Sequence, residues 1–87
     1  LEPNFPNPFN PITTIGYQLP SAGEVSLDIY NILGEKVKRL VADRQAAGVH
    51  KVVWNGRDDS GRPVPSGIYL YRLSFENQME QRQMILL

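Results

Sequence analysis

The sequence contains no cysteine and only one histidine, His50. Without cysteine the chain has no disulfides, thiolate nucleophiles or cysteine-ligated zinc. A lone histidine can form neither a transition-metal site nor an ordinary catalytic triad within the chain. We therefore expect His50 to have a structural role and the domain to hold no cofactor.

A net charge and a long apolar run are also missing. Nine Lys and Arg residues balance nine Asp and Glu residues, so no net field attracts the phosphate backbone of a nucleic acid. No apolar stretch reaches the roughly 18 to 20 residues that cross a bilayer as a helix, and no segment resembles a signal peptide. We expect neither a nucleic-acid partner nor a transmembrane segment.

With 87 residues, the chain has room for one domain. A domain of this size buries only roughly 60 to 65% of its unfolded surface, so a deep catalytic cleft is hard to accommodate. The length thus favours flat or edge-mediated binding over catalysis. The sequence opens on Leu1 without an initiating Met, and we interpret it as part of a longer polypeptide with upstream domains.

Residues 1–11, called the lead-in below, contain four of the seven prolines. Each proline fixes φ and restrains the preceding residue to extended geometry. Phe5 and Phe9 lie in this segment, and large aromatic side chains in such a stretch more often pack onto the adjoining domain than face water. We expect the extended lead-in to dock on a sandwich formed by residues 12–87.

The rest of the chain is a series of short runs in which apolar and polar residues alternate, the pattern of half-buried strands. Residues 49–55 are apolar on both faces, which is typical of a central strand. Residues 35–42 fit either a bulged strand or a short helical turn, and we favour the strand. The last two runs, 68–76 and 79–87, predict a hairpin across Asn77 and Gln78. The other two runs are 12–19 and 24–30.

Six or seven short strands at about ten-residue spacing, without a convincing helix, predict an all-β fold. The expected architecture is an immunoglobulin-like antiparallel β-sandwich of about seven strands. The disulfide of immunoglobulin domains cannot form here, so Trp54 is expected to pack between the sheets and to provide much of the core.

Asn55, Asp58 and Asp59 place three oxygen-bearing side chains at the glycine-rich loop 56–67, and calcium binds through such groups. The loop lacks the regular acidic spacing of an EF-hand, and Asn and Asp side chains routinely cap their own turns. We favour turn capping, with calcium binding as the alternative. Asp58 and Asp59 could also suggest a glycosidase pair, but neighbouring loop residues point apart. We expect no catalytic residue.

Four aromatic residues could instead line a sugar-binding face: Tyr30, Trp54, Tyr69 and Tyr71. On alternating strands most aromatic side chains face the core, and a small sandwich without cysteine needs them there. We favour the core.

Three sequence blocks occur together: NFPNPFNP at 4–11, VSLDIYNILG at 25–34, and GVHKVVWNGRD at 48–58 followed by PSGIY at 65–69. In this order and spacing they resemble the C-terminal type A sorting domain of the bacterial type IX secretion system. That family is similar to the immunoglobulin-like domain of flagellar hook-capping proteins.

The resemblance implies a seven-stranded, non-catalytic sandwich at the end of a secreted protein, which directs it through an outer-membrane translocon. The protein would cross the periplasm and reach the cell surface or the medium. By the family's pattern, the export machinery recognises the last strand, and an exposed edge strand can accept a partner strand. Members commonly have a basic residue after this strand, where this sequence ends. The implied recognition residues are Arg82, Gln83, Met84, Ile85, Leu86 and Leu87.

Two other functions stay open. One is an accessory carbohydrate-binding or spacer module of a secreted glycoside hydrolase, which predicts exposed aromatic side chains. The other is an assembly module like the hook-capping domain, with which the neutral charge and the edge strands are compatible.

Overall fold

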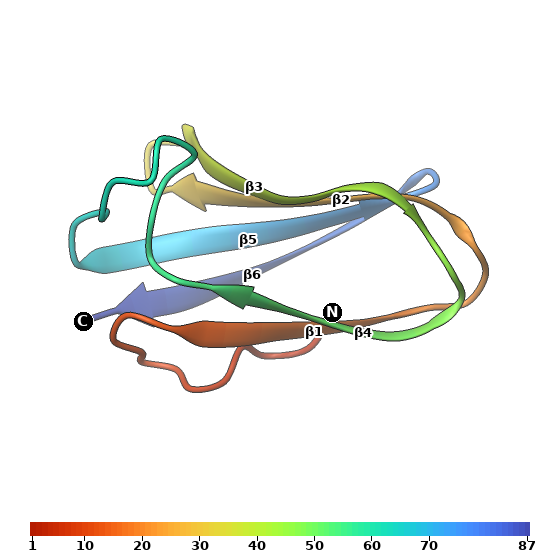
Figure 1. The fold of residues 1–87 in the computed structure, drawn as a ribbon, viewed down its shortest axis with the longest axis horizontal. Helices are drawn as coiled ribbons and strands as arrows, with labels where there is room; N and C mark the ends of the chain where they lie inside the picture. The colour runs from red at the N-terminus through yellow and green to blue at the C-terminus, as the bar shows by residue number, and fades with distance from the viewer.

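The computed structural model describes all of residues 1–87. The chain forms six antiparallel strands in two layers (Figure 1). A two-stranded sheet pairs β1 with β4, and a four-stranded sheet has the order β3-β2-β5-β6. None of its segments is a helix of the length and hydropathy that crossing a membrane requires. The strands are β1 (Thr13–Leu19), β2 (Gly23–Asn31), β3 (Lys36–Gln45), β4 (Gly48–Trp54), β5 (Gly67–Phe75) and β6 (Gln78–Leu86). The predicted all-β antiparallel sandwich is confirmed, with six strands where about seven were expected.

The lead-in makes one isolated β-bridge to each sheet and forms no strand of its own. Phe5 makes an isolated antiparallel bridge to Thr14, and Phe9 makes a parallel bridge to Leu86. The neighbouring prolines have no N–H to donate, so the pairing cannot extend along the chain.

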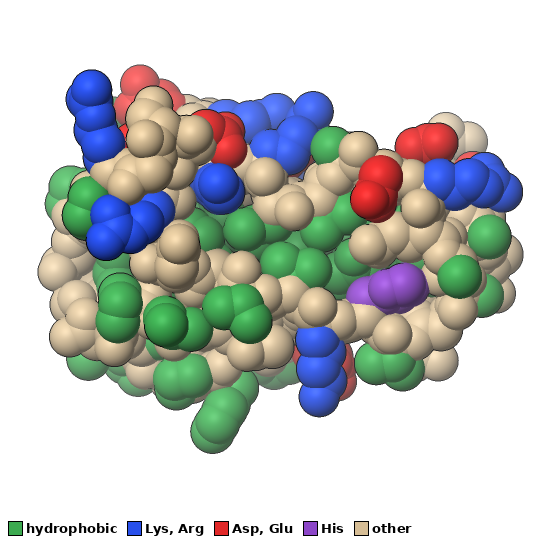
Figure 2. Space-filling view, in the orientation of Figure 1, with side chains coloured by type: hydrophobic (Ala, Val, Ile, Leu, Met, Phe, Trp, Pro, Cys, Tyr) green, Lys and Arg blue, Asp and Glu red, His purple; other side chains and the backbone are tan.

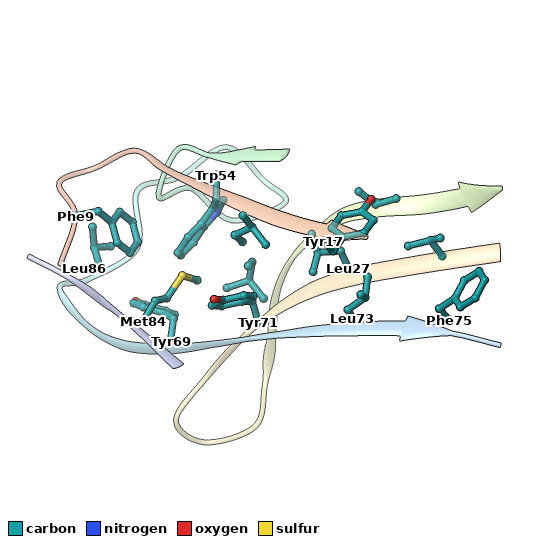
Figure 3. Close-up of a cluster of buried hydrophobic side chains, with 14 of the residues drawn as sticks. Phe9, Tyr17, Leu27, Trp54, Tyr69, Tyr71, Leu73, Phe75, Met84 and Leu86 are labelled. Atoms are coloured by element: carbon teal, nitrogen blue, oxygen red, sulfur yellow. The ribbon is translucent and has the colours of Figure 1, made fainter. Parts of the chain in front are cut away.

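The core fills the space between the sheets (Figure 3). Trp54 is fully buried there, edge-on to Tyr69 with ring centroids 5.4 Å apart and tilted against Phe9 at 5.7 Å. The indole Nε1 donates a hydrogen bond to the Arg57 carbonyl at 2.9 Å, which satisfies the one polar group of this buried ring. The prediction that Trp54 packs between the sheets is confirmed. The other buried apolar residues are Ile15, Tyr17, Leu19, Val25, Leu27, Ile29, Val41, Tyr71, Leu73, Phe75, Met84 and Leu86.

The expectation that residues 49–55 form a central strand is wrong, because β4 pairs with β1 alone. Val49 and Val53 are 66% and 58% exposed on its outer face, whereas Trp54 points into the core. Alternation shows which residues share a face, but an apolar residue on the second face can simply be exposed.

β3 is a strand with two irregularities, as the favoured interpretation of residues 35–42 predicted. Its register against β2 shifts between Leu27 and Asp28 and again between Ile29 and Tyr30. Such bulges increase the local twist of an edge strand and make it a poorer template for another strand. The predicted hairpin of β5 and β6 is also confirmed, with a continuous register from Gly67–Leu86 to Phe75–Gln78.

Candidate recognition edge

β6 is an outer strand of the four-stranded sheet and contains most of the predicted recognition residues 82–87. The side chains of Met84 and Leu86 are buried in the core and are therefore hidden from a partner. The side chains of Arg82 and Gln83 are exposed. The structure thus divides the predicted segment into a buried and an accessible part.

The backbone at the end of β6 is already hydrogen-bonded to the lead-in. The Ile85 amide donates to Asn7 Oδ1 at 3.0 Å, and the Ile85 carbonyl accepts from the Phe9 amide at 3.0 Å. The Leu87 amide donates to the Phe9 carbonyl at 2.9 Å. While the lead-in is docked, residues 85–87 cannot pair with a partner strand.

The open part of the edge is Met79–Gln83. In an antiparallel ladder, the residues of an edge strand alternately direct both backbone groups toward the neighbouring strand and away from it. Ile85 directs its N–H and C=O away from β5, and the ladder continues without a bulge. The backbone groups of Met79, Gln81 and Gln83 therefore also point away from β5. We call these three residues the open edge.

Two side chains beside the open edge fasten the start of the lead-in. Arg82 Nε donates to the Leu1 carbonyl at 2.8 Å, and Glu80 Oε2 forms an ion pair with the Leu1 amino group at 2.7 Å. Both side chains are exposed, so the ion pair contributes little to stability. They place Leu1 against β6.

A buried side-chain hydrogen bond and a backbone hydrogen bond also hold the lead-in on β1. Asn4 Nδ2 donates to Thr13 Oγ1 at 3.0 Å, and the Glu2 amide donates to the Gly16 carbonyl at 2.9 Å. The expectation that both phenylalanines pack on the domain is right for Phe9, which is 1% exposed, and wrong for Phe5, which is 80% exposed. Because Phe5 bridges the outer edge of β1 through its backbone, its side chain faces solvent.

The opposite edge of the four-stranded sheet is partly closed by the loop that contains the calcium candidates. The Asp59 amide donates to the Val37 carbonyl at 3.1 Å, and Asp59 Oδ1 accepts from the Arg39 amide at 3.3 Å. Lys38 Nζ lies 3.7 Å from the same carboxylate oxygen. Asp59 therefore occupies backbone groups of β3 that another strand would need.

Asn55 and Asp58 serve the turn of their own loop. Asn55 Oδ1 accepts from the amide two residues on at 3.2 Å, while Asp58 Oδ1 accepts from the amides of Ser60 at 2.9 Å and Arg62 at 3.0 Å. No group of three or more His, Cys, Asp or Glu side chains is placed to hold a metal. Asp58 faces its own loop and Asp59 faces β3, so the two carboxylates point apart.

Of the four candidates for a sugar-binding face, three are buried: Trp54, Tyr69 and Tyr71. Tyr30 lies on the outer face of the four-stranded sheet, where the guanidinium carbon of Arg72 is 4.5 Å from its ring centroid. The prediction of a core role is confirmed for the three buried rings. They cannot stack on a sugar, so these three rings form no sugar-binding face.

His50, the purple side chain in Figure 2, belongs to β4 and is half-buried. Its ring stacks on Tyr17 at 5.3 Å, and Nε2 is 2.7 Å from the Ala46 carbonyl. These contacts are those of a packing residue. The same view shows charged side chains of both signs gathered toward β3 and few over the two-stranded sheet (Figure 2).

Two solved structures from Porphyromonas gingivalis share the fold over 98% of this chain. Dimeric latent PorU has a TM-score of 0.77 at 21% identity, with 9% of its chain covered. PorZ, an essential bacterial surface component of the type IX secretion system, has a TM-score of 0.68 at 20% identity, with 11% of its chain covered. The search of curated proteins gave no match.

FlgD from P. aeruginosa is 26% identical over 86% of this chain and 60% of its own, with a TM-score of 0.67. The present chain thus spans less than two thirds of the length of each of these structures. At the sequence level, residues 11–78 match the FlgD Ig-like domain. Because that match covers most of the chain, the protein belongs to the FlgD Ig-like domain family.

Proposed function

We propose that this domain is a non-catalytic sorting module that directs a larger exported protein through the type IX outer-membrane translocon. The observation that carries the proposal is the open edge of β6, since the family resemblance assigns recognition to this strand. The fold shared with PorZ, a type IX component, supports the same assignment. On this proposal the protein passes through the periplasm and ends at the cell surface or in the medium.

Recognition by strand addition explains how so small a domain can be read without a cleft. Unpaired N–H and C=O groups provide affinity, and side chains that alternate along the strand provide specificity. The lead-in already occupies the backbone of residues 85–87. The stretch read by the machinery is therefore Met79–Gln83, which overlaps the segment 82–87 at Arg82 and Gln83.

A fusion of this chain to a passenger protein in a type IX-competent host tests the proposal. We expect export of the passenger to depend on Gln81, because Gln81→Pro removes an outward N–H and adds a ring to the open edge. The ladder to β5 does not use that N–H, so the domain should still fold. The matched control Gln81→Thr keeps the N–H and should be exported. Retention of the unaltered fusion in the periplasm would contradict the proposal.

The family match favours a second candidate, an assembly module like the Ig-like domain of the hook-capping protein. A chimaeric FlgD that carries this chain in place of its own Ig-like domain separates the two. Restored hook assembly would favour the assembly module. Normal export of the passenger together with a failed chimaera would favour the sorting module.

A further inference from the structure

We propose that two copies of this chain associate by antiparallel pairing of β6 with β6, centred on Gln81. The inference goes beyond the proposed function and does not depend on it. It follows from the positions of the open backbone groups, from the charges beside them and from the space that the lead-in leaves free.

The backbone fits a symmetric pair. In an antiparallel ladder, two facing residues exchange both hydrogen bonds only if both direct their N–H and C=O across the junction. When Gln81 faces Gln81 of the second copy, Met79 faces Gln83 and Gln83 faces Met79. Each residue of the open edge then faces a residue of the other copy whose N–H and C=O groups also point across the junction. The two-fold axis makes the contact self-complementary and closed.

Charge selects this register. With Gln81 at the centre, Glu80 of one copy faces Arg82 of the other on the same face of the extended sheet, and opposite charges in directly facing positions are favourable. Both side chains are exposed at the edge, where each also contacts Leu1 of its own chain. A shift of two residues preserves the backbone match but places Glu80 opposite Glu80, or Arg82 opposite Arg82. Both shifted registers bring like charges together.

The lead-in limits the pair to this length. In the same register Ile85, whose backbone the lead-in already uses, faces Asn77 of the second copy. Asn77 lies in the turn between β5 and β6, outside both strands. The partner strand therefore ends before the residues of β6 whose backbone is bonded to Asn7 and Phe9, and those hydrogen bonds can stay in place.

The other edge of the four-stranded sheet and the outer edge of β1 are protected in ways that β6 is not. β3 has two register shifts and hydrogen bonds to Asp59, and β1 is bridged by Phe5. Natural sheets block their edges with bulges, Pro, Lys or covering segments. β6 contains no Pro or Lys and has no bulge, and its outward backbone groups are hydrogen-bonded to the lead-in only at Ile85 and Leu87.

Sedimentation equilibrium of the 87-residue chain from about 10 µM to about 1 mM, a range suited to a small interface, tests the pairing. We expect a reversible monomer–dimer equilibrium. E80R and R82E should each raise the dissociation constant by about tenfold or more, because each places like charges opposite one another. The double variant E80R/R82E restores opposite charges and should return the constant to near its original value.

This rescue distinguishes pairing from a loss of folding, because a merely structural role of the Leu1 contacts would not be restored by exchanging the charges. Gln81→Pro should abolish the dimer while Gln81→Thr preserves it, with both variants unfolding near the original temperature. A chain that is monomeric throughout, or a double variant as weak as the single ones, would overturn the proposal.

Discussion

The hydroxyl oxygen of Tyr71 accepts a hydrogen bond from the backbone amide of Asn4 at 2.9 Å. The same hydroxyl donates to the Glu2 carbonyl at 2.8 Å. Tyr71 belongs to β5, in the middle of the four-stranded sheet. This contact therefore joins residues 67 positions apart in the sequence and fixes the lead-in that covers the end of β6.

Tyr71→Phe should lower the free energy of unfolding by about 1 to 3 kcal/mol, because the buried Asn4 amide loses its acceptor. Tyr30→Phe is the matched control, since the Tyr30 ring lies on the outer face under Arg72. It should change stability by less than about 0.5 kcal/mol. Urea unfolding of the two variants checks this, and equal effects would show that the Tyr71 hydroxyl does not anchor the lead-in.

Stability should fall with rising pH above the ordinary tyrosine pKa of 10.0, because burial raises the pKa of Tyr17, Tyr69 and Tyr71. In this range the unfolded chain loses phenolic protons that the folded chain keeps, so ionisation favours unfolding. Below pH 10 the stabilisation by the neutral phenols is fully present. Urea midpoints from about pH 8 to about pH 11 measure the decline, and Tyr71→Phe should reduce its slope. A flat profile would contradict the prediction.

The two phenylalanines of the lead-in form a natural matched pair. Phe9→Ala should cost about 3 to 5 kcal/mol, because it empties a buried site beside Trp54. Phe5→Ala should cost less than about 0.5 kcal/mol, because its side chain is exposed. Thermal unfolding followed by the fluorescence of Trp54 measures both. Similar losses in the two variants would mean that Phe5 is also packed.

Asp58 should act as a turn-building residue that needs no calcium. Asp58→Ala should cost about 1 to 2 kcal/mol, because two loop amides lose their acceptor. Asp58→Asn keeps an acceptor oxygen and should be nearly neutral. Calcium at about 1 mM, enough for an extracellular-type site, should leave the melting temperature unchanged. A rise with calcium that Asp58→Ala removes would instead establish a metal site.

The sequence by itself determined which residues form strands and which of their side chains face inward. Tyr69, Tyr71 and Leu73 illustrate this, since alternation along one strand is a local property that backbone geometry imposes. The turn-capping role of Asp58 was predictable because it also depends on nearby residues, and the burial of Trp54 because a small core without a disulfide needs its largest aromatic ring.

Only the tertiary structure decided which edges are open. The placement of β4 beside β1 alone, the exposure of Phe5 and the covered backbone of Ile85 were not predictable. Ile85 is hydrogen-bonded to Asn7, 78 residues away in the sequence. A period of two identifies the face of a strand but carries no information about its neighbours in the sheet, because backbone hydrogen bonds lie in the sheet plane, perpendicular to the side chains.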